Sequence, residues 1–93
     1  MRKYELTVIF PPEEDLHKAG RERLLADLAA NGAEIEKTEE PGDRDLAYEI
    51  KKKRRGKYVL FIVRMESSKI AVLDRVFKLN ANLLKYLFVK IEE

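Results

Sequence analysis

Residues 44–63, with the sequence RDLAYEIKKKRRGKYVLFIV, decide the fold of this chain. Both ends of the stretch are rich in β-branched and aromatic residues, which favour strands. Between them, six of the seven residues 51–57 are Lys or Arg, and the seventh, Gly56, favours a turn. The pattern therefore predicts a β-hairpin with a turn at Gly56. Its tip must stay in solvent, because unpaired cations are rarely buried, and we interpret it as an arm suited to contact RNA.

Length and composition bound the possibilities. The 93 residues, of which 45% are hydrophobic, suffice for a single core, so we expect one domain over residues 1–93. The net charge of +2 does not by itself predict binding to nucleic acid. Charge is placed unevenly, however, because acids dominate residues 34–49 and are absent from residues 51–57. Local fields of this kind can attract a polyanion.

The chain has no cysteine, which excludes disulfides, thiolate metal sites and a thiol nucleophile, and suits a reducing compartment. We find neither the apolar core of a signal peptide nor an apolar run of membrane-spanning length. We therefore expect a cytoplasmic protein. Paired acids such as Glu39 and Glu40 occur without a neighbouring histidine or a glycine-rich loop, so we predict no metal site and no cofactor.

The first third of the chain predicts a strand followed by a helix. Residues 4–10 alternate as in a strand, and Pro11 and Pro12 end it. Three acids at residues 13–15 favour a helix start, and Gly32 favours a left-handed stop. The apolar stripe expected on this helix consists of Leu16, Ala19, Leu24, Leu25, Leu28 and Ala29.

Two residues of this helix are unusual. Gly20 costs the helix interior roughly 1 kcal/mol relative to alanine, so the helix should depend on packing. His17, the only histidine, lies among charged residues. We expect it on the surface and without a catalytic role, because the sequence offers no residue to orient it.

The middle of the chain predicts two further strands. Residues 33–38 alternate as in a half-exposed strand, and extension resumes at residues 46–50 after Pro41 and Gly42. Because proline cannot donate to a strand ladder, this strand should lie at an edge or contain a bulge. Residues 58–65 are apolar at nearly every position, which is typical of a central strand.

The last third predicts a helix and a final strand. Ser67 and Ser68 are candidate N-caps before apolar residues at helical spacing, and residues 83–91 form the last strand. The resulting order, βαββαβ, is that of a ferredoxin-like α+β fold. Right-handed crossovers place both helices on one face of a four-stranded antiparallel sheet, with the first and third strands in the centre.

The other face of this sheet is left open. Depending on the parity of the third strand, the side chains that point away from the helices are either Tyr58, Leu60 and Ile62 or Val59, Phe61 and Val63. Exposed apolar area of this kind predicts a protein partner. We assign the partner face to Tyr58, Leu60 and Ile62.

Four motifs, in this order, resemble a known family. They are MRKYE at residues 1–5, residues 42–50 with the core LAYEI, YVL at residues 58–60 and FKLN at residues 77–80. Together they resemble the bacterial small-subunit ribosomal protein six family over essentially the whole chain.

The resemblance implies a ferredoxin-like assembly protein without enzymatic activity or small-molecule substrate. It implies binding to the central domain of small-subunit ribosomal RNA as a pair with small-subunit ribosomal protein eighteen. Family positions and the charge run together give the predicted RNA-binding residues Arg2, Lys3, Tyr4, Arg44, Tyr48, Lys51, Lys52, Lys53, Arg54, Arg55 and Lys57.

Alternatives remain at this stage. Residues 51–57 can be a solvated loop that keeps an edge strand soluble, and Tyr48 can lie at the rim of the core. The same fold also carries ligand-binding regulators and small enzymes such as acylphosphatase-like hydrolases. Such an enzyme needs an anion-cradling loop after the first strand, and here residues 10–15 are acidic and contain two prolines, which disfavours it.

Overall fold

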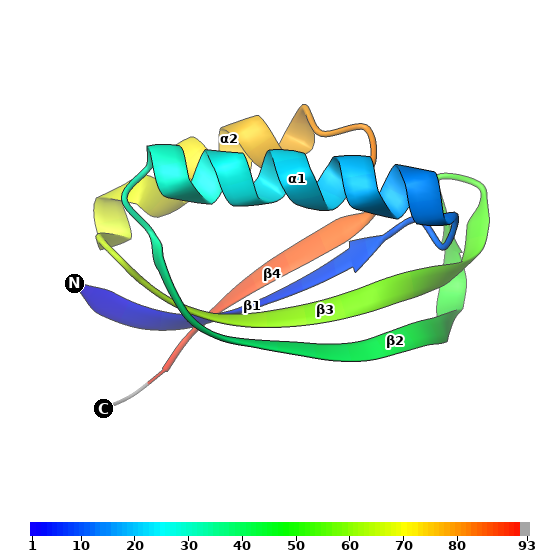
Figure 1. Cartoon of the computed structure of the whole chain (residues 1–93), viewed down its shortest axis with the longest axis horizontal. Helices are drawn as coiled ribbons and strands as arrows, with labels where there is room; N and C mark the ends of the chain where they lie inside the picture. Colours follow the sequence, from blue (N-terminus) through cyan, green and yellow to red (C-terminus); the bar gives the residue numbers. More distant parts are fainter. Residues whose placement is uncertain (92–93) are drawn as a thin grey trace.

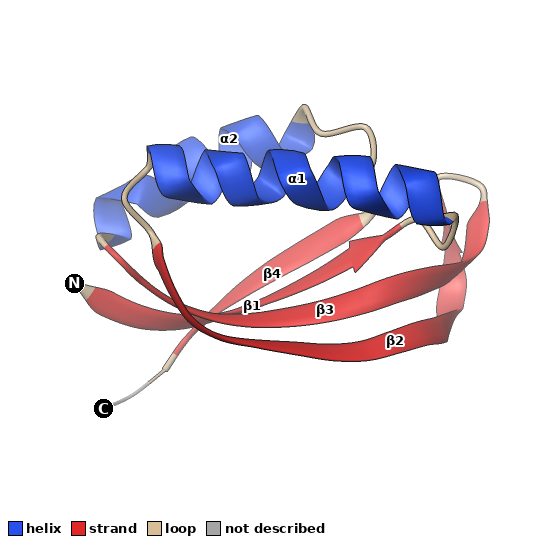
Figure 2. Cartoon of the chain, viewed as in Figure 1, coloured by secondary structure: helices blue, strands red, loops and turns tan. Residues whose placement is uncertain are grey.

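The computed structural model describes residues 1–91, which form a sheet covered on one face by two helices (Figures 1 and 2). The strand order in the sheet is β2-β3-β1-β4, with all neighbours antiparallel. This is the predicted ferredoxin-like α+β fold, with β1 and β3 in the centre. The elements are β1 (Arg2–Phe10), α1 (Glu14–Ala30), β2 (Glu34–Ile50), β3 (Lys53–Met65), a short 3₁₀ helix (Ser67–Lys69), α2 (Ile70–Lys78) and β4 (Lys85–Lys90).

The register of the two central strands sets which side chains enter the core. Leu6 of β1 lies opposite Phe61 of β3, and Val8 lies opposite Val59. All four point toward the helices and are buried. Burial of their apolar surface, at about 25 cal/mol per Å², is the main force that holds the two layers together. The helices contribute the buried side chains Leu24, Leu28, Leu73 and Phe77.

Helix α1 ends as predicted but buries a narrower stripe. Gly32 has a φ of 72°, the left-handed conformation expected after the helix. The buried positions are Gly20, Leu24 and Leu28, spaced four residues apart. Ala19 and Ala29 are exposed, so their assignment to the stripe is wrong. The sheet contacts one line of the helix, and these two alanines lie beside that line.

Gly20 is needed for close packing rather than being a weak point. A Cβ atom at Gly20 would lie 2.1 Å from the carbonyl oxygen of Asn82, in the loop before β4. The buried Asn80 side chain donates a hydrogen bond of 3.1 Å to the Gly20 carbonyl and accepts one of 3.1 Å from the Asn82 amide. Residues 80–82 therefore join α1 to the β4 side of the molecule.

Strand β2 is both an edge strand and bulged, the two alternatives that Pro41 predicted. It runs through Pro41 without a break, and its pairing with β3 shifts between Glu39 and Gly42. Gly42 has a φ of 91°, which permits the bulge. The interruption expected at Pro41 is therefore absorbed within one strand.

The predicted turn at Gly56 is wrong. The turn consists of Lys51 and Lys52, whose φ values are 49° and 66°. Gly56 lies inside β3, where a Cβ would be 2.3 Å from Cγ2 of Ile9. The glycine is thus explained by close approach of a neighbouring side chain, which the local sequence does not reveal.

The last third of the chain differs from expectation at its boundaries. Helix α2 begins at Ile70, after the 3₁₀ helix, and neither Ser67 nor Ser68 provides a side-chain cap. Strand β4 begins at Lys85 rather than at residue 83. The two preceding leucines are buried, and the Leu84 amide donates to the Ile9 carbonyl at 2.7 Å. They fix the start of β4 against β1.

Candidate nucleic-acid and partner interface

The tip of the β2–β3 hairpin is fixed to the rest of the molecule at two points. Lys51 Nζ donates a hydrogen bond of 3.0 Å to the Leu83 carbonyl, in the loop before β4. Lys53 forms an ion pair with Glu13, immediately before α1. The hydrogen bond from Lys53 holds the pKa of Glu13 below its ordinary value. The tip is therefore held at one end of the sheet, at the opposite end from the N-terminus (Figure 1).

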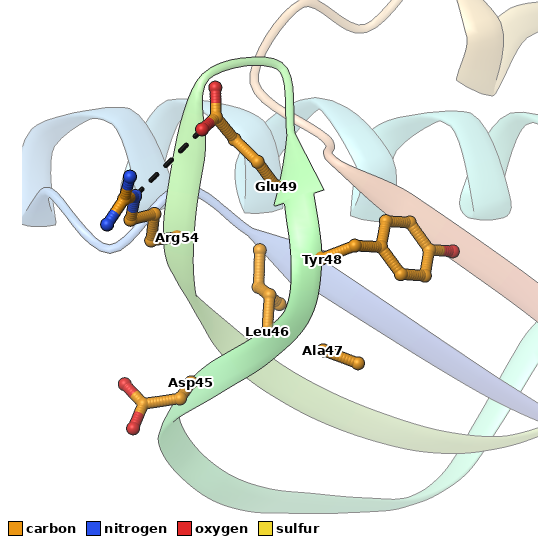
Figure 3. Close-up of a pocket in the computed structure, with 6 residues that line it drawn as sticks. All are labelled: Asp45, Leu46, Ala47, Tyr48, Glu49 and Arg54. Atoms are coloured by element: carbon orange, nitrogen blue, oxygen red, sulfur yellow. Dashed lines mark ion pairs between the residues drawn. The ribbon is translucent and has the colours of Figure 1, made fainter.

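Two of the four arginines of the predicted site, Arg54 and Arg55, lie beside carboxylates of the opposite strand. Arg54 Nε is 3.9 Å from Glu49 Oε2, and both side chains are exposed (Figure 3). The Arg55 guanidinium is 3.3 Å from Asp45 Oδ1. Exposed pairs of this kind contribute about 0–1 kcal/mol, so a phosphate can replace either carboxylate at small cost.

Three further cations lie along the same end. Lys52 is exposed at the turn, and Arg44 is exposed on β2 opposite Gly56. Lys57 is half-buried opposite Asp43. Within residues 1–91, neither Arg44 nor Lys52 forms an ion pair.

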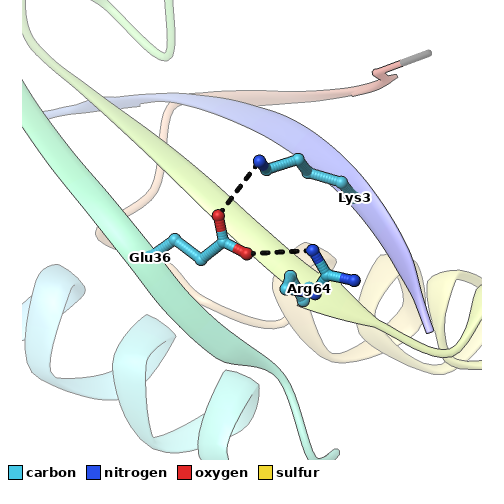
Figure 4. A network of polar contacts seen from close by, with 3 residues as sticks. All are labelled: Lys3, Glu36 and Arg64. Atoms are coloured by element: carbon cyan, nitrogen blue, oxygen red, sulfur yellow. Dashed lines mark hydrogen bonds and ion pairs between the residues drawn. The ribbon is translucent and has the colours of Figure 1, made fainter. Parts of the chain in front are cut away.

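Arg2 and Lys3 lie at the other end of the sheet. Arg2 pairs with Met65 in the register, whereas Phe10 pairs with Lys57, so the two ends are about 26 Å apart at the usual rise per residue. Lys3 Nζ is 3.1 Å from Glu36 Oε1, and the Arg64 guanidinium is 3.3 Å from Glu36 Oε2 (Figure 4). The predicted RNA-binding residues thus form two groups rather than one.

The two aromatic residues of the prediction are placed differently. Tyr4 is only 7% exposed and packs edge-on against Phe88, inside the core. Tyr48 is 62% exposed and points from β2 toward β4 (Figure 3). Lys85 Nζ donates a hydrogen bond of 3.0 Å to the Tyr48 hydroxyl and lies 5.5 Å from the centre of its ring. Of the two, only Tyr48 presents a ring that a nucleobase can reach.

The third strand presents Tyr58, Leu60 and Ile62 to the face opposite the helices, since Val59, Phe61 and Val63 are buried beneath them. Strand β4 adds Leu87 and Val89, which are 57% and 46% exposed. Residues 86–89 are apolar at every position, which indicated that both faces of β4 are apolar, but the prediction omitted Leu87 and Val89. We call the set Ile9, Tyr58, Leu60, Ile62, Leu87 and Val89 the open sheet face.

His17 is half-buried rather than on the surface. Its ring lies 5.1 Å from that of Phe10, and burial, followed by the charges of Lys57 and Arg21, lowers its pKa. A lowered pKa keeps His17 neutral near pH 7. In the described part of the chain, no group of three or more His, Asp or Glu residues is arranged to hold a metal ion.

A model of one known protein family matches nearly the whole chain. Residues 3–90 match the model of ribosomal protein S6. The chain belongs to the ribosomal protein S6 family. It is 54% identical to small ribosomal subunit protein bS6 of Treponema denticola over 94 residues, which cover 100% of both chains. It is 42% identical to the bS6 protein of Treponema pallidum over 92 residues, which cover 99% of each chain.

Solved structures agree with this membership. The crystal structure of 30S ribosomal protein S6 from Thermotoga maritima superposes with a TM-score of 0.84 at 25% identity, covering 97% of this chain and 87% of that one. The C-terminal domain of the MgtC protein from Mycobacterium tuberculosis gives a TM-score of 0.65 at 12% identity, which shows the shared fold alone.

Membership in the ribosomal protein S6 family defines the general role of the chain. It is a non-enzymatic structural constituent of the small ribosomal subunit, and its place is the ribosome in the cytoplasm. Among residues 1–91, no helix is long and apolar enough to cross a membrane.

Proposed function

We propose that this chain binds the central domain of small-subunit ribosomal RNA as a pair with small-subunit ribosomal protein eighteen. The observation that carries the proposal is an apolar open sheet face beside a fixed, cation-rich hairpin. The family defines the ribosomal role, and the geometry offers one surface for a protein and another for a polyanion.

The open sheet face supports the protein half of the proposal. Across three adjacent strands, Thr7 lies between Leu60 and Leu87, and Glu5 lies between Ile62 and Val89, so the apolar residues of β3 and β4 flank two polar side chains of β1. A sheet face with exposed apolar residues on neighbouring strands is typical of a protein interface. Docking of protein eighteen there would bury this surface and leave the hairpin tip available to RNA.

The hairpin supports the RNA half. Arg44 of this hairpin, and Arg2 at the opposite end of the sheet, can each bind phosphate oxygens through two parallel N–H donors, and Lys52 and Lys57 act as point charges. Lys51 and Lys52 occupy left-handed positions, which cost a residue other than glycine roughly 1 kcal/mol each. Cations kept at strained positions fit a binding role better than a purely solvating one.

The proposed RNA surface keeps most of the predicted set. Because the Tyr4 ring lies in the core, we leave that residue out. The remaining residues are Arg2, Lys3, Arg44, Tyr48, Lys51, Lys52, Lys53, Arg54, Arg55 and Lys57.

A pair of aspartate substitutions tests the partner face. Leu60→Asp introduces a charge in the middle of the open sheet face, and we expect it to weaken the complex with protein eighteen and RNA at least tenfold. Ala26→Asp adds the same charge at an exposed position of α1, outside both proposed surfaces, and should leave the affinity unchanged. Isothermal titration of both variants, with circular dichroism to verify folding, gives the measurement. Equal affinities for folded Leu60→Asp and the unaltered chain would reject the open sheet face.

A further inference from the structure

Three lysines surround a recess where the hairpin tip meets the loop before β4. The recess has a volume of about 310 Å³ and is lined by Lys51, Lys78 and Lys85. These come from the β2–β3 turn, the end of α2 and the start of β4. We call this site the lysine recess. Its other lining residues are Phe77, Leu83, Leu84 and Tyr86.

The positive charge of the lysine recess is only partly compensated. Lys51 donates a hydrogen bond to the Leu83 carbonyl, and Lys85 donates one to the Tyr48 hydroxyl. Both acceptors, which we call the neutral anchors, are uncharged oxygen atoms. Within residues 1–91, Lys78 alone of the three has a carboxylate partner, with its Nζ 3.0 Å from Asp74 Oδ2. The hydrogen bond to Tyr48 raises the pKa of Lys85, so this lysine stays charged at neutral pH. No lining residue is acidic.

Other cations of the hairpin contrast with this arrangement. Lys53, Arg54 and Arg55 each lie beside a carboxylate of their own chain. An anion that binds them must displace that carboxylate. An anion that enters the lysine recess meets Lys51 and Lys85 without such competition.

The anchoring of these two lysines also suits binding. A lysine ammonium has three N–H donors, and Lys51 and Lys85 each use one of them within the chain. The neutral anchors limit the loss of side-chain entropy on binding and leave two donors on each nitrogen for a ligand. Compact ammonium groups around one recess bind a phosphate as point charges.

We propose that the lysine recess binds a backbone phosphate of ribosomal RNA, with Lys85 and Lys78 as contacts in addition to Lys51. This inference rests on the proposed function, because it names where on the RNA-binding end one phosphate lies. It extends that surface beyond the hairpin, to the end of α2 and the start of β4.

The salt dependence of binding tests the inference. Each phosphate contact adds roughly 0.7–0.9 to the negative slope of log affinity against log salt concentration. The probe is a central-domain ribosomal RNA fragment titrated with the chain together with protein eighteen. We expect Lys85→Met to reduce the slope by about one such unit, and Lys51→Met/Lys85→Met by about two.

Lys18→Met is the matched control, because it removes the same charge from an exposed position of α1. It should leave the slope unchanged. The single variant Lys85→Met keeps the test valid if the double variant, altered at the turn, fails to fold.

The outcomes separate the two proposals. If the unaltered chain binds RNA and the slope of Lys85→Met is unchanged, the recess assignment is overturned and the proposed function stands. A slope reduced equally by Lys18→Met would indicate a general charge effect and also overturn the assignment. If the unaltered pair shows no binding, the proposed function fails and the recess assignment fails with it.

Discussion

Single residues in this chain are often explained by contacts that lie far away in the sequence. From helix propensity alone, Gly20 should destabilise α1. The backbone carbonyl of Asn82, however, lies so close to Gly20 that no larger residue fits there. The buried amide of Asn80 bonds to the same turn of α1. The identity of residue 20 is therefore set by tertiary packing, which helix propensity does not report.

Gly20→Ala should destabilise the chain. An alanine usually stabilises a helix interior by roughly 1 kcal/mol relative to glycine, but here its Cβ would force the Asn82 backbone aside. Overpacking of this kind costs about 1–3 kcal/mol, so we expect a net loss in the free energy of unfolding. Urea denaturation measures it.

The exposed position 19 offers a control on the same helix. Ala19→Gly should cost roughly 1 kcal/mol through propensity alone. A Gly20→Ala chain that is more stable than the unaltered one would contradict the close approach seen between α1 and the loop before β4.

The contact between Tyr86 and Asp74 should make stability depend on pH in two ranges. The hydrogen bond from the Tyr86 hydroxyl, with Lys78 as a second cause, lowers the pKa of Asp74 below 3.8. This contribution is complete above pH 3.8 and is lost as the pH falls through the lower, folded-state pKa. Burial, followed by the bond to Asp74, raises the pKa of Tyr86 from 10.0 to about 12. That contribution is complete below pH 10.0 and is lost as the pH rises toward 12.

Tyr86→Phe tests both ranges with one substitution. The difference in melting temperature between the unaltered chain and the variant should be largest at neutral pH and should shrink in both acid and alkali. Thermal melts followed by circular dichroism between pH 2 and pH 12 cover the range set by these pKa values. A difference independent of pH would show that the hydroxyl makes no such bond in solution.

Among the elements, the β2–β3 hairpin shows which features local sequence predicts and which it does not. Strand propensity placed its two arms, and Pro41 predicted an edge strand or a bulge; the structure has both. The turn was misplaced because glycine is the usual marker of a left-handed position, and here two lysines occupy it. Gly56 is required instead by the side chain of Ile9, on a strand distant in sequence.

Lys52→Gly should stabilise the hairpin. The φ of 66° at residue 52 costs a lysine about 1 kcal/mol, which glycine does not incur, and part of this gain is offset by the greater freedom of glycine in the unfolded chain. Chemical denaturation should show an unchanged or higher free energy of unfolding, by up to about 1 kcal/mol. Arg54→Gly, in the extended strand β3, should instead lose about 0.5–1 kcal/mol. Equal losses in the two variants would mean that residue 52 is not left-handed in solution.

At the scale of the whole molecule, the fold was predictable and the distribution of the site was predictable only in part. Hydrophobic alternation and the order of the elements gave the ferredoxin-like sheet with its central strands. The run of cations at residues 51–57 predicted that the tip of the β2–β3 hairpin is positively charged. Antiparallel pairing of β1 with β3 implies that Arg2 and Lys3 lie at the opposite end of a molecule 35 Å long, and the alternation of β1 puts Tyr4 on the buried face; the predicted set of RNA-binding residues used neither implication. Sequence could not bring Lys78 and Lys85 beside Lys51, because that recess depends on how two loops meet.

The most direct measurement is a titration of the purified chain against a central-domain ribosomal RNA fragment, with and without protein eighteen, at two salt concentrations. Tight binding that requires protein eighteen and weakens steeply at the higher salt concentration is the expected result, because the open sheet face docks the partner and the cations meet phosphates. No binding in either condition, or binding that is insensitive to salt, would contradict the proposed role.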